Sequence, residues 1–473
     1  MSELMSRPLG TQTITVLVPT GALGAGVDAA DVARGIALGI DAIACDAGST
    51  DSGPSYLARA VSKVSRESIR SDLSILIPAA FKAGVPLIVG SCGTSGADAG
   101  VDWTRDIALE VAQANGIAPK IALLYSEQSH ATIEQKLAAD KISSLSPATD
   151  ISGGIIAECN HIVALMGVEP YIEALKQGAD IVLGGRTTDT AVLGCVPIMK
   201  GAAPGLVWHA AKITECGGLC SVNPREGGVL FRIGDDSFEV EPLRLSNSCT
   251  PYTVSSHMLY ENSDPFLLTE PGGILDVTCA TYEAVDDRIT KVTGSRWTPQ
   301  PYTMKLEGAD GGPFQTIMFI GIRDPKVLSS LEVFQERMLR QLNRRVETAI
   351  GEAAGDYDIS LRVYGWSGVS GQTPAPGTPI PSEVGVMFVA TASSQEMATR
   401  IAKTCNPIFF HFPLDAGLEL PSYAFPFSPA EIERGQVYAF KLNHVVAVEN
   451  GLELVRIGWA DYPGAAKKEG EHA

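Results

Sequence analysis

Between residues 12 and 200, short and uniformly apolar segments alternate with longer segments of helical periodicity. The apolar segments lie in ITVLVPTG, DAIACDAG, PLIVGSCG, KIALLYSE and DIVLGGRTTD, and the longest helical segments are SRESIRSDLSILIPAAFKAG and DWTRDIALEVAQANG. Strands that are apolar throughout are typical of a parallel sheet that helices cover on both faces. This alternation constrains the fold most, and it predicts an α/β fold with a mostly parallel sheet in the N-terminal part.

After about residue 225 the pattern changes to alternating strands with turn residues between them, as in GGVLFRIGDD, SFEVEPLRL, YTMKLEG and FQTIMFIGI. A long amphipathic helix, DPKVLSSLEVFQERMLRQLNRRVETAIG, and a Pro/Gly-rich loop that could serve as a linker, GQTPAPGTPIP, come later. We therefore expect a mixed α+β C-terminal part. The predicted domains are a parallel α/β ligand-binding domain (1–225), a β-rich module with a long helix (226–370) and a C-terminal α+β segment (371–473).

Composition excludes several classes of protein. The chain of 473 residues has a formal charge of −18, and its longest basic runs are the pairs Arg344-Arg345 and Lys467-Lys468, so it lacks the basic surface that nucleic acid or an anionic membrane requires. No apolar run approaches the roughly 20 residues of a membrane span, and the N-terminus does not resemble a signal peptide. Nine scattered cysteines indicate reduced thiols and a cytoplasmic protein. The apolar composition favours a homo-oligomer.

Each of the five strands predicted before residue 200 is followed by a short polar loop: PTGALGAG, CDAGSTDSG, GSCGTSGAD, YSEQSH and GGRTTDTA. Ligands of open α/β sheets bind beyond the carboxyl ends of the strands. Because parallel strands share that edge, we expect the five loops to converge on one edge of the sheet, where a ligand would bind.

The loop CDAGSTDSG places Asp46 and Asp51 close to the hydroxyls of Ser49 and Thr50. Two carboxyl groups at short separation shift each other's pKa apart, which suits one for a general base and the other for a general acid. A Mg²⁺ ion held by Asp46, Asp51 and Asp189 is a variant of this hypothesis. The alternative is a polar turn that caps a helix.

The loop GSCGTSGAD offers backbone amides at Gly93, Thr94 and Ser95, which could bind a carboxylate or phosphate oxygen at a helix N-terminus. Cys92 could be a thiol of lowered pKa at the same place. A buried free cysteine is more often a small apolar filler, and we favour that interpretation of Cys92.

The loop GGRTTDTA places Arg186 after a strand and two glycines, followed by Thr187, Thr188 and Asp189. An arginine can bind a substrate carboxylate with two parallel hydrogen bonds. The competing interpretation is a salt bridge to Asp189 or to another acid at the strand ends, with a threonine or Asp189 capping the helix.

Further candidates are weaker. His209, Lys212 and Cys216 share one helical face with Glu215 beside them, so His209 could transfer protons, although a solvated helix face is the simpler interpretation. His161 is a similar candidate. Cys216 and Cys220 lie one helical turn apart, but no second cysteine pair completes a tetrahedral zinc site. GALGAG is too loose a match to the dinucleotide fingerprint to predict NAD, and no P-loop is present.

Together, CDAGSTDSGP, IVGSCGTSGADAGVD and DIVLGGRTTDTA resemble motifs of the acyclic terpene utilisation AtuA family, over residues 12 to about 440. The resemblance implies a role in the catabolism of branched acids and terpenoids, at a cleavage or hydration step on a carboxylate or acyl-CoA. It also implies a small partner of about a hundred residues, the size of a small domain, which members of the family carry either as a fused segment or as a separate subunit.

Three functions follow as hypotheses. The first is a cofactor-independent or Mg²⁺-assisted lyase or hydratase, with Asp46 and Asp51 as acid and base and Arg186 as the carboxylate clamp. The second is an isomerase or racemase of a small carboxylic acid that uses Cys92 and a second base. The third is a non-catalytic large subunit that scaffolds the small partner.

Overall fold

The structure is a computed structural model, and it describes residues 13–148, 150–260, 262–375, 377–410, 412–414 and 420–461. The basic pair Lys467-Lys468 lies outside these ranges. The chain divides into two compact units, one formed by Met1–Asp310 with Phe440–Ala473 and the other by Gly311–Ala439. These boundaries differ from those expected at residues 225 and 370.

The first unit is built on a ten-stranded sheet whose centre is parallel, with the strand order β1-β2-β3-β7-β4. These strands are β1 (Ile14–Val18), β2 (Ala42–Asp46), β3 (Leu87–Gly90), β4 (Ile121–Tyr125) and β7 (Ile181–Gly184). They are the five apolar segments that the sequence indicated. The predicted α/β fold with a mostly parallel sheet in the N-terminal part is confirmed, and the polar loops after the five strands leave one edge of the sheet.

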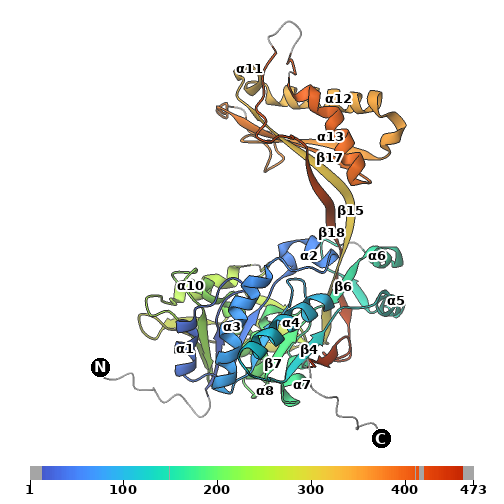
Figure 1. Ribbon diagram of the computed structural model, residues 1–473. Coiled ribbons are helices and arrows are strands. Elements are labelled where there is room, and N and C mark those ends of the chain that lie inside the picture. The colour runs from blue at the N-terminus through green and yellow to red at the C-terminus, as the bar shows by residue number, and fades with distance from the viewer. Residues whose placement is uncertain are drawn as a thin grey trace. The chain divides into compact units, whose positions relative to one another are not determined.

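Helices cover both faces of this sheet, which explains why the strands are apolar throughout. Leu17, Ile43 and Leu87 point to the face covered by the first set of helices, whereas Val16 and Ile88 point to the other. The first set, prominent in Figure 1, is α1 (Ala29–Ala37), α3 (Arg66–Ala83) and α4 (Asp98–Ala114). The second set is α7 (Glu169–Lys176), α8 (Asp189–Met199) and α9 (Pro204–Thr214).

The same sheet continues into antiparallel strands at both edges. On one side the order is β1-β8-β9-β13-β12, and on the other β19 pairs with β4. β8 runs antiparallel along the whole of β1, from Ile14 opposite Ile233 to Val18 opposite Val229. The change of pattern after residue 225 therefore marks a change of strand direction within one sheet and no domain boundary. The added strands are β8 (Val229–Ile233), β9 (Ser237–Pro242), β12 (Thr281–Ala284), β13 (Thr290–Thr293) and β19 (Arg456–Trp459).

A small three-stranded sheet and several short elements complete the first unit. The sheet consists of β10 (Leu267–Glu270), β11 (Gly273–Asp276) and β14 (Arg296–Pro299). The other elements are α2 (Pro54–Ala58), α5 (His130–Ala138), β5 (Ile142–Ser144), α6 (Gly153–Glu158), β6 (His161–Ala164), α10 (Pro251–Ser256) and the 3₁₀ turns η1 (Thr50–Ser52), η2 (Gly217–Cys220) and η3 (His257–Leu259).

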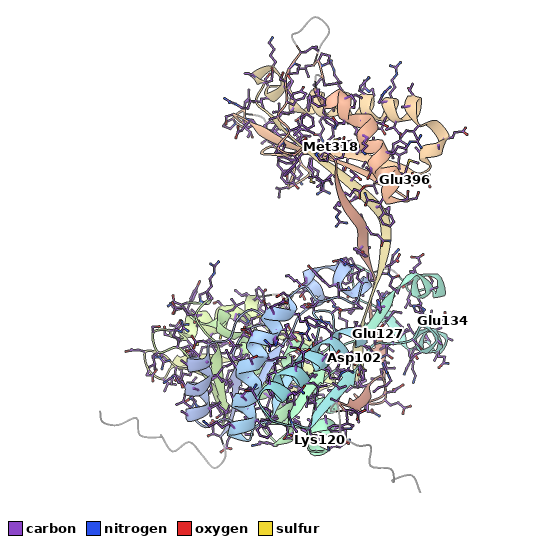
Figure 2. All side chains as sticks on the ribbon, in the orientation of Figure 1. Asp102, Lys120, Glu127, Glu134, Met318 and Glu396 are labelled. Carbon is purple, nitrogen blue, oxygen red and sulfur yellow. The ribbon has the colours of Figure 1, made fainter. Side chains whose placement is uncertain are left out.

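The second unit packs helices on an antiparallel sheet. β15 (Thr303–Ile322) is one strand of 20 residues, where the sequence predicted two; its beginning pairs with β6 in the first unit and its end with β17 in the second. Met318 of β15, labelled in Figure 2, lies in the core of the second unit with Phe334 and Phe388. The other elements are α11 (Pro325–Leu328), α12 (Leu331–Ala349), η4 (Gly351–Ala354), β16 (Tyr357–Tyr364), β17 (Val384–Ala392) and α13 (Gln395–Phe410). β18 (Ile432–Ala447) begins in the second unit, and its end pairs with β5 in the first.

The fold also bears on the predicted linker and on membrane-spanning helices. The loop GQTPAPGTPIP connects β16 to β17, neighbouring strands of one sheet, so it is not a linker between the units. Among the described helices, none combines the length and the apolar character needed to cross a bilayer.

Candidate active site

Three of the polar loops meet through direct backbone contacts that only glycine allows. A Cβ atom on Gly48 would lie 2.3 Å from the Cα of Thr94, and a Cβ on Gly96 would lie 2.2 Å from the backbone nitrogen of Arg186. Each contact is too close for any side chain, so these glycines let the loops after β2, β3 and β7 pack directly on one another. For these three loops the expected convergence is present, and their glycines make it possible, whereas the loop after β4 lines a different cavity.

The loop after β3 is buried beneath the other two. The amide of Ser91 donates to the carbonyl of Gly185 at 3.0 Å, and the amide of Cys92 donates to that of Gly184 at 2.9 Å. Gly93, Thr94 and Ser95 are buried too, and the Thr94 hydroxyl accepts from the amide of Lys63 at 2.9 Å. Cys92 has no exposed surface, and burial raises the pKa of its thiol to about 12. This loop therefore packs against the loop after β7, and none of its residues is among those that line the cavity over the loops after β2 and β7.

A cavity of about 470 Å³ lies over the loops after β2 and β7, and we call it the acidic cavity. Acidic and basic side chains dominate its wall, and they come from distant parts of the first unit. The lining residues are Asp51, Leu165, Arg186, Thr188, Asp189, Thr190, Lys212, Glu215, Asn262, Ser263, Asp264, Leu267, Leu268, Thr269, Glu270 and Lys305.

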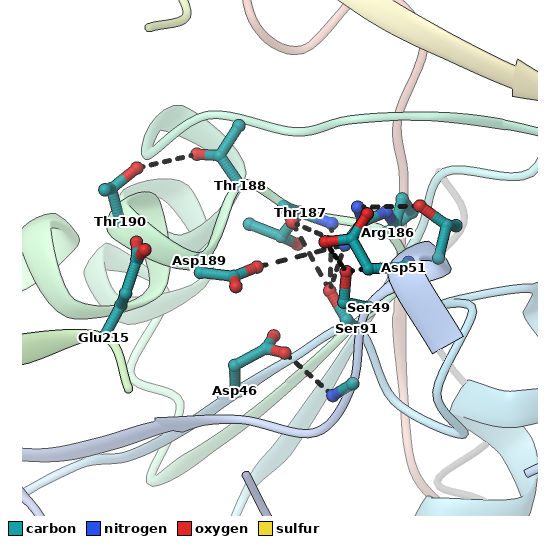
Figure 3. Close-up of polar contacts among 12 residues, drawn as sticks. Asp46, Ser49, Asp51, Ser91, Arg186, Thr187, Thr188, Asp189, Thr190 and Glu215 are labelled. Carbon is teal, nitrogen blue, oxygen red and sulfur yellow. Dashed lines mark hydrogen bonds and ion pairs between the residues drawn. The ribbon is translucent and has the colours of Figure 1, made fainter. Parts of the chain in front are cut away.

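Asp46 and Asp189 bring two carboxyl groups together where β2 and β7 end (Figure 3). Asp46 is 3% exposed; its Oδ2 accepts from the amide of Gly48 at 2.7 Å, and its Oδ1 is buried without a hydrogen-bond partner. Burial raises the pKa of Asp46 well above its usual value, and the charge of Asp189 raises it further. Asp46 therefore keeps a proton at a pH where an exposed aspartate has lost it.

Lys212 and Glu215 form a buried ion pair at the end of α9, with Lys212 Nζ 2.6 Å from Glu215 Oε1. Burial raises the pKa of Glu215 well above its usual value; Lys212 opposes this, and Asp189 and Glu270 add to it. Burial also acts to lower the pKa of Lys212, but Glu215 outweighs it and raises that pKa. The pair thus holds one firmly bound proton on Lys212 beside a carboxyl group of increased basicity.

Glu270, the last residue of β10, is the carboxyl group best suited to proton transfer near neutral pH. It is 9% exposed, and its Oε2 accepts from the hydroxyl of Thr190 at 2.8 Å. Burial raises the pKa of Glu270 to about 7, with a further contribution from Asp189. A group with this pKa can both accept and donate a proton at physiological pH.

Arg186 is already engaged by two carboxylates: Asp189, at 3.9 Å, is the salt-bridge partner that the sequence suggested, and Glu307 is one that it did not indicate. The Nε of Arg186 donates to Glu307 Oε2 at 2.9 Å, and its terminal nitrogens donate to the hydroxyls of Ser91 and Thr50 at 3.3 and 3.2 Å. Burial acts to raise the pKa of Glu307, but Arg186 and Lys305 outweigh it and lower that pKa to about 2. The charge of Arg186 is therefore largely neutralised, and Lys305, whose side chain is 40% exposed, is the cation more accessible from the cavity.

The remaining residues of the two loops have mainly local roles. Asp51 is exposed, lines the cavity and accepts from the hydroxyl of Ser49 at 2.9 Å. Thr187 is buried and bonds to Tyr171 at 2.7 Å. Thr188 lines the cavity and precedes α8 without capping it through its side chain.

The structure separates both candidate histidines from the acidic cavity. His209 is fully buried, with Nδ1 2.8 Å from Ser295 Oγ and Nε2 3.1 Å from Tyr282 Oη, and burial lowers its pKa to about 3. His161 lies 2.6 Å from Glu127, the labelled residue after β4 in Figure 2. Glu127 lines a second cavity of about 510 Å³, together with Asp98, Gln128, Ser129, Thr132, Glu453, Leu454, Val455 and Arg456.

Within the described ranges, the side chains whose ligand atoms could share one metal ion are Glu215, Cys216 and His257, with all three atoms within 4.8 Å of one another. This set differs from the predicted set of Asp46, Asp51 and Asp189. Sequence reasoning missed Glu270, Lys305 and Glu307, which lie on strands without a polar motif. The only signal for Lys305 and Glu307 was the presence of two charged residues in the predicted strand YTMKLEG.

The family model described as "Acyclic terpene utilisation family protein AtuA" matches residues 54–200 and 244–437. The match includes IVGSCGTSGADAGVD and DIVLGGRTTDTA, two of the three motifs that carried the resemblance, and begins at the end of the third. Neither a curated protein nor a solved structure matches the chain. The match extends over most of the chain, so the protein belongs to this family.

Proposed function

We propose that this member of the acyclic terpene utilisation AtuA family is a lyase of the hydratase type, acting on a small carboxylate or its acyl-CoA thioester. The observation that carries the proposal is the carboxyl group of Glu270, with a pKa of about 7, in the same cavity as Asp189 and the ammonium group of Lys305. Elimination of water needs a base, an acid and a cation for the substrate's negative charge, and one cavity offers all three.

In this proposal Asp189 and Glu270 exchange protons with the substrate. One removes the proton on the carbon next to the carboxyl or thioester group, and the other protonates the leaving hydroxyl. The carbon–oxygen bond breaks, water leaves, and a double bond forms; hydration is the reverse. Asp46 lies behind Asp189, and its proton keeps a second negative charge away from that carboxylate. This differs from the initial hypothesis, in which Asp46 and Asp51 were acid and base.

Lys305, rather than Arg186, is proposed to hold the substrate carboxylate. Arg186 donates to Glu307, and removing it from that partner would leave a buried charge, which is costly. Lys305 touches the same glutamate but has a more exposed side chain and can reach a ligand without uncovering a buried carboxylate. Arg186 then serves to fix the loop from which Asp189 projects.

The test is incubation of the purified chain with 3-hydroxy acids, their CoA thioesters and the corresponding unsaturated compounds, followed by mass spectrometry for gain or loss of water. Glu270→Gln and Asp189→Asn should each slow turnover by about 10²–10⁴-fold, the usual contribution of a general acid or base. Glu396→Gln, an exposed change on α13, is the matched control and should leave turnover unchanged. Full activity in both cavity variants would refute the assignment.

The same experiment in deuterium oxide separates the alternatives. Deuterium uptake into the substrate without gain or loss of water would indicate an isomerase or racemase; Cys92, buried and with a raised pKa, is a poor base for that reaction. Turnover only after addition of a small partner protein would support a heteromeric enzyme, and binding without turnover would support the scaffold hypothesis. Nine cysteines without a disulfide fit the reducing cytoplasm that we propose as the location.

A further inference from the structure

Beside the acidic cavity, three side chains of different chemistry point their ligand atoms at one place. They are the carboxylate of Glu215 at the end of α9, the thiol of the next residue, Cys216, and the imidazole of His257 at the start of η3. Their ligand atoms all lie within 4.8 Å of one another. We propose that Glu215, Cys216 and His257 form a binding site for a divalent transition-metal ion, with zinc as the ion that best fits this ligand set.

The strongest sign of a missing partner is on His257. The residue is 6% exposed, and its Nε2 is buried without any hydrogen-bond partner. A buried imidazole nitrogen normally has a partner, because leaving a polar atom unsatisfied costs about 1–3 kcal/mol. The ring itself is held in place, stacked on Tyr260 with ring centres 5.5 Å apart. A metal ion is the partner that the neighbouring thiol and carboxylate would share.

The backbone around Cys216 is also fixed. A Cβ on Gly21, in the loop after β1, would lie 2.6 Å from the carbonyl oxygen of Cys216, and a Cβ on Gly217 would lie 2.6 Å from the amide nitrogen of Gly21. Gly217 adopts a φ of 59°, where side chains are disfavoured. Because Gly21 and Gly217 pack directly on each other, the loop after β1 fixes the position of Cys216. A ligand site that is arranged before the metal binds requires such a fixed position.

The ligand atoms and the distances between them indicate which metal ion fits the site. Nitrogen and sulfur ligands disfavour Mg²⁺, which binds oxygen, and favour zinc, which accepts all three atom types. Zinc bonds of about 2.0–2.3 Å place tetrahedral ligands about 3.5 Å apart, so the three groups would have to close by about an ångström. Three protein ligands also leave one position open, the arrangement of catalytic zinc sites.

Electrostatics around the site favour a cation in spite of Lys212. Asp189, Glu215 and Glu270 line the adjoining cavity together with Lys212, and a bound cysteine is a thiolate, so the acidic groups outnumber the ammonium group that is paired with Glu215. Lys212 donates a hydrogen bond to Oε1 of Glu215, so a metal ion that binds this carboxylate competes with Lys212 for it. Binding would then free Lys212 toward the acidic cavity, which Glu215 and Lys212 both line.

The test uses the full chain, stripped of metal with a chelator and then titrated with zinc or cobalt. We expect one zinc ion per chain, and cobalt binding should give the thiolate charge-transfer absorption of a cysteine ligand. His257→Ala and Cys216→Ser should each weaken zinc binding at least tenfold, and Cys216→Ser should abolish the charge-transfer band. Cys279→Ser is the matched control, because Cys279 is exposed and lies outside the cluster; it should change neither.

Absence of stoichiometric zinc binding by the wild-type chain would overturn the inference, and so would unchanged affinity in both cluster variants. If the variants do not fold, the wild-type cobalt spectrum decides: the charge-transfer band supports the site, and cobalt binding without it refutes the site. These readouts need no substrate. Zinc binding without hydratase activity would thus support the metal site and contradict the proposed reaction. Hydratase activity without zinc binding would support the proposed reaction and contradict the metal site.

Discussion

Two cavities of the first unit are both lined by glutamates, but the pKa values of these glutamates are shifted in opposite directions. In the acidic cavity, burial raises the pKa of Glu270 to about 7 and that of Glu215 well above its usual value. In the second cavity, burial also acts to raise the pKa of Glu127, but the hydrogen bonds from His161 and the Asp98 amide, with the charges of His161 and Arg456, together outweigh it and lower that pKa. The hydrogen bond from Glu127, in turn, raises the pKa of His161.

The pKa values shift in opposite directions because Glu127 and Glu270 have different hydrogen-bond partners and different exposure. Glu127 and His161 have side chains 21% and 29% exposed and face each other directly, so each charge stabilises the other. Glu270 is 9% exposed and has a neutral hydroxyl as its hydrogen-bond partner, with Asp189 close by. Glu127 in the second cavity is thus stabilised in its charged form by an ion pair. Glu270 in the acidic cavity is suited to carry a proton, and its charged form lowers the stability of the fold.

Arg186→Met should cause the largest loss of stability. The substitution leaves Glu307, whose side chain is 4% exposed, without its main cation, and breaking a buried ion pair costs about 3–5 kcal/mol. Urea denaturation followed by circular dichroism measures the loss. The matched control is Arg456→Met beside the second cavity, where the arginine side chain of the Arg456–Asp98 pair is 63% exposed and the cost should not exceed about 1 kcal/mol. Equal losses in the two variants would contradict the contrast in burial.

Glu270→Gln should change the pH dependence of stability. Because the folded-state pKa of Glu270 is about 7 and its ordinary value is 4.5, the folded chain binds more protons than the unfolded chain between these pH values. The free energy of unfolding therefore falls as pH rises through this range, by up to about 3 kcal/mol at 1.36 kcal/mol per pKa unit. Glutamine removes this dependence, so the variant should match the wild type near pH 4 and exceed it at pH 8. Parallel curves for the two chains would show that Glu270 titrates normally.

The sequence allowed the sheet and the convergence of its loops to be predicted, because both follow from local patterns. Strands such as Leu87–Gly90, buried on both faces, must be apolar throughout, and parallel strands must place their following loops at one edge. The acidic cavity required contacts that no local pattern encodes. Glu270 meets Thr190 across 80 positions, and Glu307 meets Arg186 across 121 positions. Both glutamates lie on strands whose partners the sequence did not identify, so Arg186 was expected to be available to a substrate.

Gly96→Ala tests the backbone contact that joins two loops of the acidic cavity. An alanine Cβ would lie 2.2 Å from the backbone nitrogen of Arg186, at a φ of 66° that alanine disfavours. Gly116→Ala is the matched control, since Gly116 has a φ of 65° and nothing within 4 Å of its added Cβ. Both variants incur the cost of the left-handed conformation, and Gly96→Ala should lose about 1–3 kcal/mol more through overpacking. Equal losses would show that the loops can separate without cost.

The smallest expected effect is the coupling between Glu127 and His161 in the second cavity. A double-mutant cycle with Glu127→Gln and His161→Gln should give a coupling free energy of up to about 1 kcal/mol, because both side chains are partly exposed and water screens their charges.

The coupling between Glu127 and His161 should also depend on pH. The raised pKa of His161 means that its contribution is fully present below the unfolded value of 6.5 and is lost as pH rises through the folded value. The lowered pKa of Glu127 means that its contribution is present above the unfolded value of 4.5 and is lost as pH falls through the folded value. The coupling should therefore be greatest between these two limits and decline on either side, whereas the effect of Glu270 runs in one direction only. A coupling that stays constant from acid to alkaline pH would mean that the two residues share a neutral hydrogen bond, and the contrast between the cavities would then rest on burial alone.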